Sequence, residues 1–278
     1  MAAALHKGRA RRWALLVVAG IFALIDECAA CVGKTMLRAG GLTCQDKQSI
    51  LDEHNRLRQL VALGQIHGQP GAANMMELIW DDELAAAAQR WADQCKESHD
   101  TSRNVRRFAV GQNIARTWTT RPPGPYDSEP NWRRQISGWF NEVQHYHTGF
   151  SRATGHYTQL VWGDTYLLGC GYSFYYDPAR GYTKNYVCNY GPSGNVLGYQ
   201  PYHSGQPACN RYGMSYSNKY SGLCCKYPSH TVKINFTCPR VRDFSPVKYF
   251  PPESSVTQLA YSFLRSIATG IPFVINIH

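Results

Sequence analysis

The sequence predicts an α+β fold, because segments with helical periodicity fill its first half and a β-hairpin lies in its second half. Three segments between residues 46 and 147 repeat apolar side chains at helical spacing. After residue 155 the repeat changes to alternation, and two later runs are rich in aromatic and β-branched residues. Helices followed by an antiparallel hairpin argue against a doubly wound parallel sheet.

The three helices are expected at residues 46–63, 81–95 and 131–147. Gly64 supplies a stop signal for the first helix. The second helix is the most clearly marked, because Asp81 can cap its start, two acidic residues follow, and Leu84, Ala88 and Trp91 belong to one apolar stripe.

The strands are expected in the segment that follows. Residues 156–162 alternate between two sets of side chains, which predicts a strand. Further strands are expected at residues 167–176 and 184–190, joined by the turn sequence DPARG at residues 177–181. These two strands therefore form an antiparallel hairpin.

The hairpin also predicts a disulfide. Its register places Cys170 opposite Cys188, where directly opposed side chains are close enough to be bridged. Cys95, at the end of the second helix, needs a partner from the N-terminal segment, with Cys44 as the first choice and Cys31 as the second. Spacing alone does not pair the remaining cysteines of the C-terminal region, which are Cys209, Cys224, Cys225 and Cys238.

The N-terminus predicts export. Residues 1–12 carry four Lys and Arg side chains and no acid, and residues 13–25 are continuously apolar, which is typical of a signal peptide. Small residues at positions 28–30 suit cleavage after Ala30, and Ile21 and Ala23 could define an earlier site. A stable membrane anchor is the weaker alternative, because a bilayer needs about 20 apolar residues.

Export explains the remaining composition. Ten cysteines in a secreted, extracellular protein indicate disulfides. Asn235 lies in the single N-glycosylation sequon. The net charge of +10 comes from dispersed basic residues without a nucleic-acid-binding motif, so a nucleic acid is not expected as a partner.

Four motifs occur in order along the chain: HNRLR (54–58), GQNI (111–114), GHYTQLVW (155–162) and YVCNYGPSGNVL (186–197). Together they resemble the CAP superfamily of cysteine-rich secretory, antigen 5 and pathogenesis-related class 1 proteins. Residues 93–115, DQCKESHDTSRNVRRFAVGQNIA, are most similar to arthropod antigen 5-like venom or salivary allergens. Ser102 replaces a cysteine that is usual in those proteins, so the corresponding bridge should be missing.

The resemblance implies a three-layer α-β-α sandwich with a cleft lined by two histidines and two acids. The matching positions are His99, Glu142, His156 and Gln112, the last being an amide in place of an acid. Imidazoles and a carboxylate can bind zinc or another divalent cation. The alternative is a hydrogen-bonded polar network in which Gln112 is a satisfied amide. His54 is expected to pack inside its helix, and Asn55 and Arg58 to fix loops.

The predicted organisation is a signal peptide at residues 1–30, a CAP domain at 44–199, a short cysteine-bearing extension at 200–240 and an unassigned tail at 241–278. The resemblance implies a secreted, non-enzymatic protein that binds an extracellular protein, a lipid or a sterol. The alternative is a metal-dependent hydrolase or protease that uses the His/Glu cleft. The chain contains neither a GxSxG nor an HExxH motif, which favours the binding protein.

Overall fold

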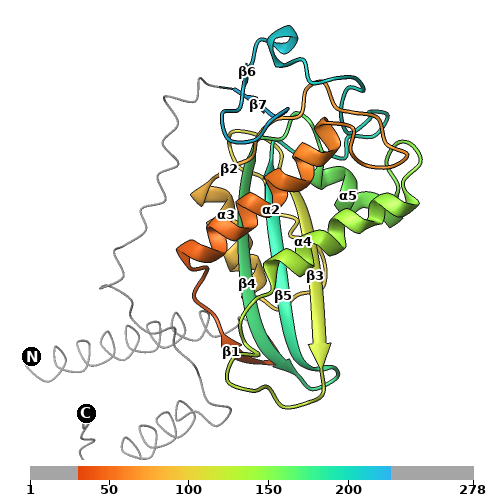
Figure 1. Cartoon of the computed structure of the whole chain (residues 1–278). Helices are drawn as coiled ribbons and strands as arrows, with labels where there is room; N and C mark the ends of the chain where they lie inside the picture. The colour runs from red at the N-terminus through yellow and green to blue at the C-terminus, as the bar shows by residue number, and fades with distance from the viewer. Residues whose placement is uncertain (1–30, 227–278) are drawn as a thin grey trace, which may run out of the picture.

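The computed structural model describes residues 31–226, in which one sheet lies between helices on its two faces (Figure 1). The sheet has the order β1-β4-β5-β3 with antiparallel pairing, and β2 runs parallel to β4. Helices α2, α4 and α5 lie on one face and α3 on the other, which confirms the three-layer sandwich. In order, the elements are β1 (Thr35–Arg38), α2 (Cys44–Ala62), β2 (Ile79–Trp80), α3 (Asp82–Ala92), β3 (Gly111–Thr119), α4 (Trp132–Phe140), η2 (Asn141–His145), η3 (Arg152–Thr154), α5 (Gly155–Leu160), β4 (Leu167–Asp177), β5 (Gly181–Gly191), η4 (Cys209–Tyr212), β6 (Ser215–Tyr216) and β7 (Cys224–Cys225).

Capping side chains set the starts of the two long helices. The Asp81 carboxylate accepts from the amide of Leu84 at 2.9 Å, as the sequence predicts for α3. Helix α2 starts two residues before the predicted position, because Thr43 and Asp46 form a reciprocal capping box. Both helices then present an apolar stripe to the sheet.

Helix α3 lies unusually close to the sheet because β4 carries two glycines beneath it. A Cβ atom at Gly171 would lie 2.4 Å from the Cα of Gln89, and one at Gly169 would lie 2.1 Å from the amide nitrogen of Ala85. Real Cβ atoms do not come so close to other atoms, so only glycine lets the backbone of α3 pack directly on the backbone of β4. The third layer therefore depends on these two glycines.

The predicted hairpin is present as β4 and β5. Their register sets Cys170 opposite Cys188, and the two form a disulfide with a Cα–Cα distance of 4.1 Å. In the extension, Cys209 pairs with Cys224, whereas Cys225 is a free thiol.

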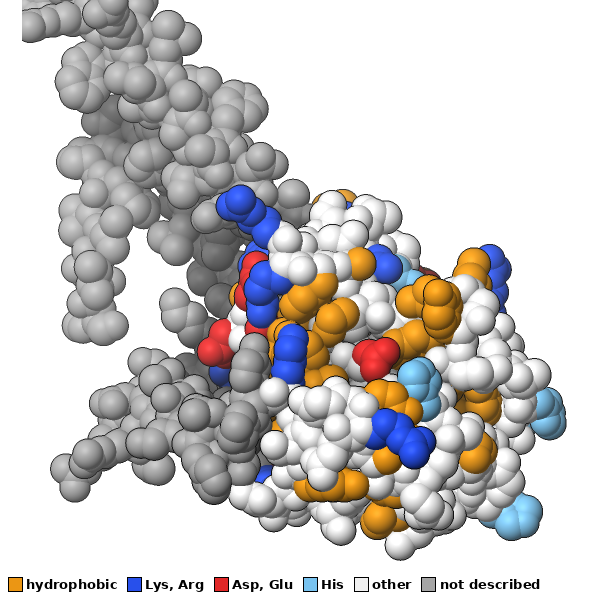
Figure 2. All heavy atoms as spheres, turned by 90° about the horizontal axis from the view of Figure 1, so that it is seen from above, with side chains coloured by type: hydrophobic (Ala, Val, Ile, Leu, Met, Phe, Trp, Pro, Cys, Tyr) orange, Lys and Arg blue, Asp and Glu red, His pale blue; other side chains and the backbone are white. Residues whose placement is uncertain are grey.

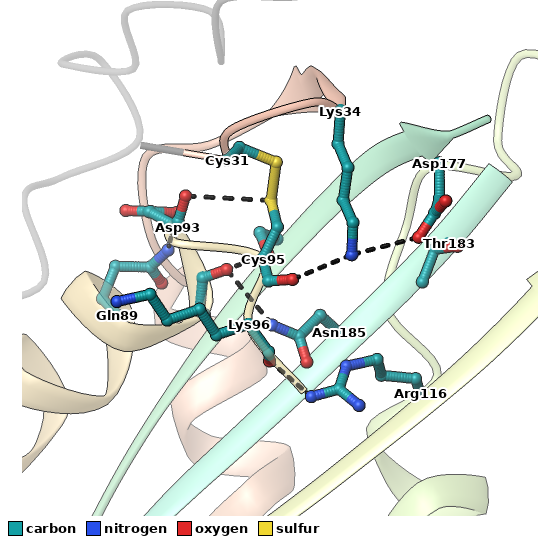
Figure 3. Close-up of a disulfide and its surroundings, with 12 residues drawn as sticks. Cys31, Lys34, Gln89, Asp93, Cys95, Lys96, Arg116, Asp177, Thr183 and Asn185 are labelled. Atoms are coloured by element: carbon teal, nitrogen blue, oxygen red, sulfur yellow. Dashed lines mark hydrogen bonds and ion pairs between the residues drawn. A yellow bond between two sulfur atoms is a disulfide. The ribbon is translucent and has the colours of Figure 1, made fainter. Parts of the chain in front are cut away.

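The first choice of partner for Cys95 is wrong, because the structure pairs Cys95 with Cys31 (Figure 3). Strand β1 runs antiparallel to the end of β4 and thereby brings Cys31 to the end of α3. The ammonium group of Lys34 joins the same region by donating to the carbonyl of Cys95 at 3.1 Å and pairing with Asp177 at 3.0 Å. Cys44 is part of a different disulfide.

The expected strand at residues 156–162 is also wrong, because residues Gly155–Leu160 form helix α5. The side chains of residues 157–160 are all buried, so no exposed polar face marks the helical period. The predicted helix at 131–147 ends as α4 at Phe140 and continues as the 3₁₀ helix η2.

The predicted signal peptide at residues 1–30, Asn235 and the tail at residues 241–278 lie outside the described residues. Within residues 31–226, no helix combines the length and the apolar character needed to cross a membrane.

Candidate functional site

The first motif, HNRLR, supports the fold from inside α2. His54 is fully buried, with Nδ1 at 2.8 Å from the carbonyl of Ile50 and Nε2 at 2.9 Å from the hydroxyl of Tyr190. Burial lowers the pKa of His54 to about 4, so its imidazole is neutral. His54 is thus a packed helix residue, as the sequence predicts.

Arg58, in the same motif, holds two loops against α2. Its buried guanidinium donates to the carbonyl of Met76 on one side and to those of Leu160, Trp162 and Thr165 on the other, at 2.6–2.9 Å. Asn55 makes two hydrogen bonds to the backbone of Leu78. These contacts fix the loops that flank α5 and β2.

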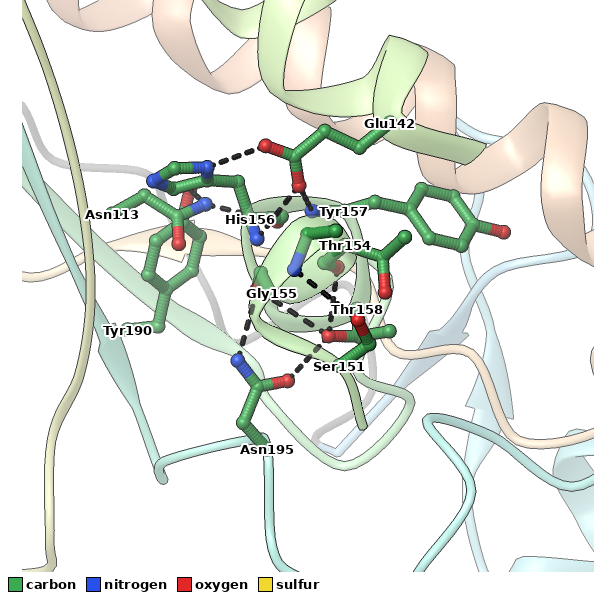
Figure 4. A network of polar contacts seen from close by, with 11 residues as sticks. Asn113, Glu142, Ser151, Thr154, Gly155, His156, Tyr157, Thr158, Tyr190 and Asn195 are labelled. Carbon is green, nitrogen blue, oxygen red and sulfur yellow. Dashed lines mark hydrogen bonds and ion pairs between the residues drawn. The ribbon is translucent and has the colours of Figure 1, made fainter. Parts of the chain in front are cut away.

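His156 lies at the start of α5, where Glu142 holds it (Figure 4). Its Nδ1 is 2.6 Å from one oxygen of Glu142, and the other oxygen accepts from the amides of His156 and Tyr157 at 3.0 and 3.1 Å. One carboxylate therefore fixes the imidazole and caps the first turn of α5. The second ring nitrogen, Nε2, points away from Glu142 and has no hydrogen-bond partner among the described residues.

Two residues that were not predicted as part of the site also position His156. The side-chain amide of Asn113 donates to the carbonyl of His156 at 3.0 Å. The indole of Trp139 stacks on the imidazole with ring centroids 6.1 Å apart. Asn113 lies inside the GQNI motif, which is the signal that points to it, whereas Trp139 is indistinguishable from a core residue in the sequence.

His99 belongs to a second hydrogen-bonded pair. Its Nδ1 lies 2.9 Å from Oε1 of Gln112, and the same oxygen accepts from the amide of Asp100. The Gln112 amide nitrogen donates to Asn189 at 3.0 Å. Gln112 is thus a fully engaged amide that orients an exposed histidine.

Both pairs adjoin the start of the edge strand β3. Gln112 and Asn113 are consecutive in β3, so their side chains point to opposite faces of the sheet. Gln112 contacts the side of α3 through Asn189, and Asn113 contacts the side of α5. No hydrogen bond joins the His99–Gln112 pair to the Glu142–His156 pair within residues 31–226.

In this arrangement a metal ion could bind only at an open, solvent-exposed site. Residues 31–226 contain no group of three or more His, Cys, Asp or Glu side chains that could hold a metal ion. The available donors are the Nε2 atoms of His99 and His156, because each Nδ1 is occupied by a side-chain oxygen. Such a donor set fits an exposed, water-completed site and not a closed structural zinc site.

The last motif is tied to the same region by Gln159 of α5. Its side-chain oxygen accepts from the amide of Gly194 at 3.0 Å. A Cβ atom at Gly111 would lie 1.9 Å from that oxygen, so the first position of GQNI must be glycine for Gln159 to reach the loop. The conspicuous motifs therefore meet around α5, mainly through structural contacts.

These features agree with comparisons to known proteins. The family model of the cysteine-rich secretory protein family (CAP) matches residues 51–190, and the chain belongs to this family. Venom allergen 3 of Solenopsis invicta is 46% identical over 174 residues, which cover 57% of this chain and 72% of that protein.

Salivary antigen-5 of Triatoma infestans is 36% identical over 209 residues, with 69% of this chain and 86% of that protein covered. Among solved structures, the crystal structure of NaASP2 with Zn²⁺ is similar with a TM-score of 0.53 and 31% identity, over 66% of this chain and 97% of that one. The chain is therefore an antigen 5-like member of the family.

Proposed function

We propose that this chain is a secreted, non-enzymatic binding protein whose His99 and His156 take up zinc or another divalent cation. The observation that carries the proposal is the contact of 2.6 Å between His156 Nδ1 and Glu142, which leaves Nε2 as the donor. A carboxylate on the second nitrogen orients a metal-binding imidazole and makes it a better ligand. His99 is oriented in the same way by Gln112.

The proposed cation site is weak and sensitive to pH. Two imidazole nitrogens leave the remaining coordination positions to water, so affinity should be far below that of a four-ligand site. Protons compete with a metal ion for the imidazole nitrogens, and affinity should therefore fall as the pH is lowered. The Zn²⁺ in the related NaASP2 structure supports testing zinc first.

Calorimetric titration with zinc at pH 7.5 tests the site. The double variant His99→Ala/His156→Ala should lose the binding isotherm. The matched control, His145→Ala/His147→Ala, also removes two exposed imidazoles and should bind like the wild type. Equal binding by the wild type and the His99/His156 variant would remove the proposed site.

The proposal of a non-enzymatic protein rests on the state of Thr158, which no base activates as a nucleophile. The buried hydroxyl of Thr158 donates to Asn195 Oδ1 at 2.6 Å and approaches the carbonyl of Thr154 at 3.1 Å, with no histidine as its partner. Gln112, an amide, cannot act as an acid or a base.

Peptide and ester libraries incubated with the protein and zinc should therefore show no hydrolysis above zinc alone. Hydrolysis that disappears in a Glu142→Gln variant would establish the hydrolase instead.

An extracellular protein, a lipid or a sterol is the proposed partner. The loop after β5 supports this role, because Val196, Leu197 and Tyr199 are 45%, 77% and 67% exposed. Figure 2 shows the upper end of the molecule, where a histidine and an acidic side chain lie among apolar side chains.

Affinity capture from an extracellular fluid, followed by mass spectrometry of proteins and lipids, tests the partner class. A Leu197→Ser/Tyr199→Ser variant should retain less of the partner than the wild type. Equal retention by both proteins would exclude this loop as the binding surface.

A further inference from the structure

A cavity of about 620 Å³ lies far from the two histidines, at the open end of the sheet. It is bounded by the last residues of β3, by β5, by the start of α4 and by the loop that joins β3 to α4. In Figure 1, strands β3, β4 and β5 extend beyond the N-terminal end of α4. Trp118 in its wall is six residues from Gln112 along β3, which places the cavity about 20 Å from that end of the strand.

The floor of the cavity is aromatic. Tyr182, Lys184 and Tyr186 alternate along β5 and therefore share one face of the sheet. Phe174 of β4 lies opposite Lys184 in the register, and its ring stacks on Tyr182 with centroids 6.3 Å apart and an interplanar angle of 25°. The ring of Tyr182 is partly exposed next to the ammonium group of Lys184, and the buried ring of Phe174 supports it from below.

The charged groups of the cavity are mainly cationic, and two of them lack a carboxylate partner. Lys184 is half-buried and donates to a backbone carbonyl, that of Glu129, at 2.8 Å. Burial lowers the pKa of Lys184, while the nearby charges of Asp127 and Glu129 act in the opposite direction. Arg134 of α4 also lines the cavity and forms no ion pair within the described part of the chain.

The acids nearby are already engaged. Asp127, the acidic residue in the lining, accepts from the amide of Gly124 at 2.7 Å and lies 3.8 Å from Arg121. The carboxylate of Glu129 pairs with Arg38 at 2.7 Å. Lys184 and Arg134 thus leave positive charge and hydrogen-bond donors for an anion.

The roof of the cavity is fixed in place by contacts to the sheet. The hydroxyl of Tyr172 donates to the carbonyl of Ser128 at 2.8 Å, and the hydroxyl of Tyr186 accepts from the amide of Asn131 at 3.1 Å. Arg38 adds the ion pair to Glu129. A ligand would therefore enter a preformed cavity and would not have to order the loop.

We propose that this cavity binds a small organic anion with a flat aromatic body and a carboxylate, sulfate or sulfonate head. The body lies on Tyr182, and the head accepts hydrogen bonds from Lys184 and Arg134. The volume falls within the range of about 300–1,000 Å³ that is usual for small-molecule sites. This site is independent of the proposed cation site at the other end of β3.

Calorimetry with naphthalene-1-sulfonate as the probe tests the proposal on the full secreted chain. Lys184→Gln keeps a donor for the carbonyl of Glu129 while removing the charge, and Arg134→Gln changes an exposed side chain. Each variant should bind the probe about tenfold more weakly, because each removes one charge-assisted hydrogen bond. Arg133→Gln is the matched control, since Arg133 is the neighbouring residue in α4 but does not line the cavity, and it should bind like the wild type.

Two further probes separate the parts of the ligand. Neutral 1-naphthalenemethanol supplies the body without the charge, and inorganic sulfate supplies the charge without the body; both should bind at least tenfold more weakly than the sulfonate. The proposal is overturned if the wild type does not bind the sulfonate, if Arg134→Gln binds it as tightly as Arg133→Gln does, or if sulfate alone binds equally well.

Discussion

Replacing Arg58 with methionine should destabilise the protein more than any surface substitution in α2. The side chain is fully buried, and methionine replaces much of its aliphatic volume without any donor. Three carbonyl groups then lose their hydrogen-bond donor, namely those of Met76, Leu160 and Thr165, whereas that of Trp162 still accepts from the amide of Thr165 at 3.2 Å.

The size of the effect follows from these three unsatisfied groups. An unsatisfied buried carbonyl costs about 1–3 kcal/mol, so the lower limit for three is about 3 kcal/mol. Removing a buried charge relieves part of its desolvation, which favours the lower limit over the upper one. The expected loss in the free energy of unfolding is therefore about 3 kcal/mol, a large share of the stability of a typical domain.

Urea unfolding at pH 7, with the disulfides intact, measures this loss. Arg90→Met is the matched control, because Arg90 is an exposed arginine of helix α3 that forms no ion pair within residues 31–226. The control should change the free energy of unfolding by about 0.5 kcal/mol or less. If Arg58→Met lies within 1 kcal/mol of wild type, the backbone clamp is not a major source of stability and the reasoning fails.

Three other predictions concern the fold. The pKa of His54 is about 4 in the folded state and about 6.5 in the unfolded state, so the unfolded state gains a proton first as the pH falls. The free energy of unfolding should therefore fall by about 3 kcal/mol between pH 6.5 and 4. A His54→Gln variant with the same pH dependence as wild type would contradict this. Gly171→Ala should destabilise the protein strongly, because the new Cβ would lie 2.4 Å from the backbone of Gln89. Gly138→Ala in α4 has only a side-chain nitrogen at 3.8 Å and should raise the free energy of unfolding by about 0.5–1 kcal/mol. A higher melting temperature for Gly171→Ala than for Gly138→Ala would contradict this explanation of the close packing. Non-reducing peptide mapping should link Cys31 to Cys95, and a linked peptide of Cys44 and Cys95 would overturn the described pairing.

The sequence predicts most of this fold wherever a local signal sets the structure. The cap at Asp81, the apolar stripe of α3 and the turn at residues 177–181 all act within a few residues, and the corresponding elements are present. Helix α5 is different, because its N-cap residue Thr154 makes no side-chain capping bond and Glu142 caps its first turn from another element. No local pattern records such a partner.

The same distinction applies to the disulfides and the site. The bridge between Cys170 and Cys188 follows from a hairpin register, but the partner of Cys95 depends on the pairing of β1 with β4, which no local signal predicts. The resemblance to CAP proteins identifies His99, Gln112, Glu142 and His156. Their grouping into two separate hydrogen-bonded pairs is seen only in the structure.

Nitrogen NMR of the imidazole side chains during a zinc titration at pH 7.5 shows which ring nitrogens bind the metal. We expect the Nε2 resonances of both His99 and His156 to shift on addition of zinc, while Nδ1 of His156 keeps its hydrogen bond to Glu142. Shifts confined to other histidines, or no shift at either Nε2, would contradict the proposed cation site and leave the two pairs as a structural polar network.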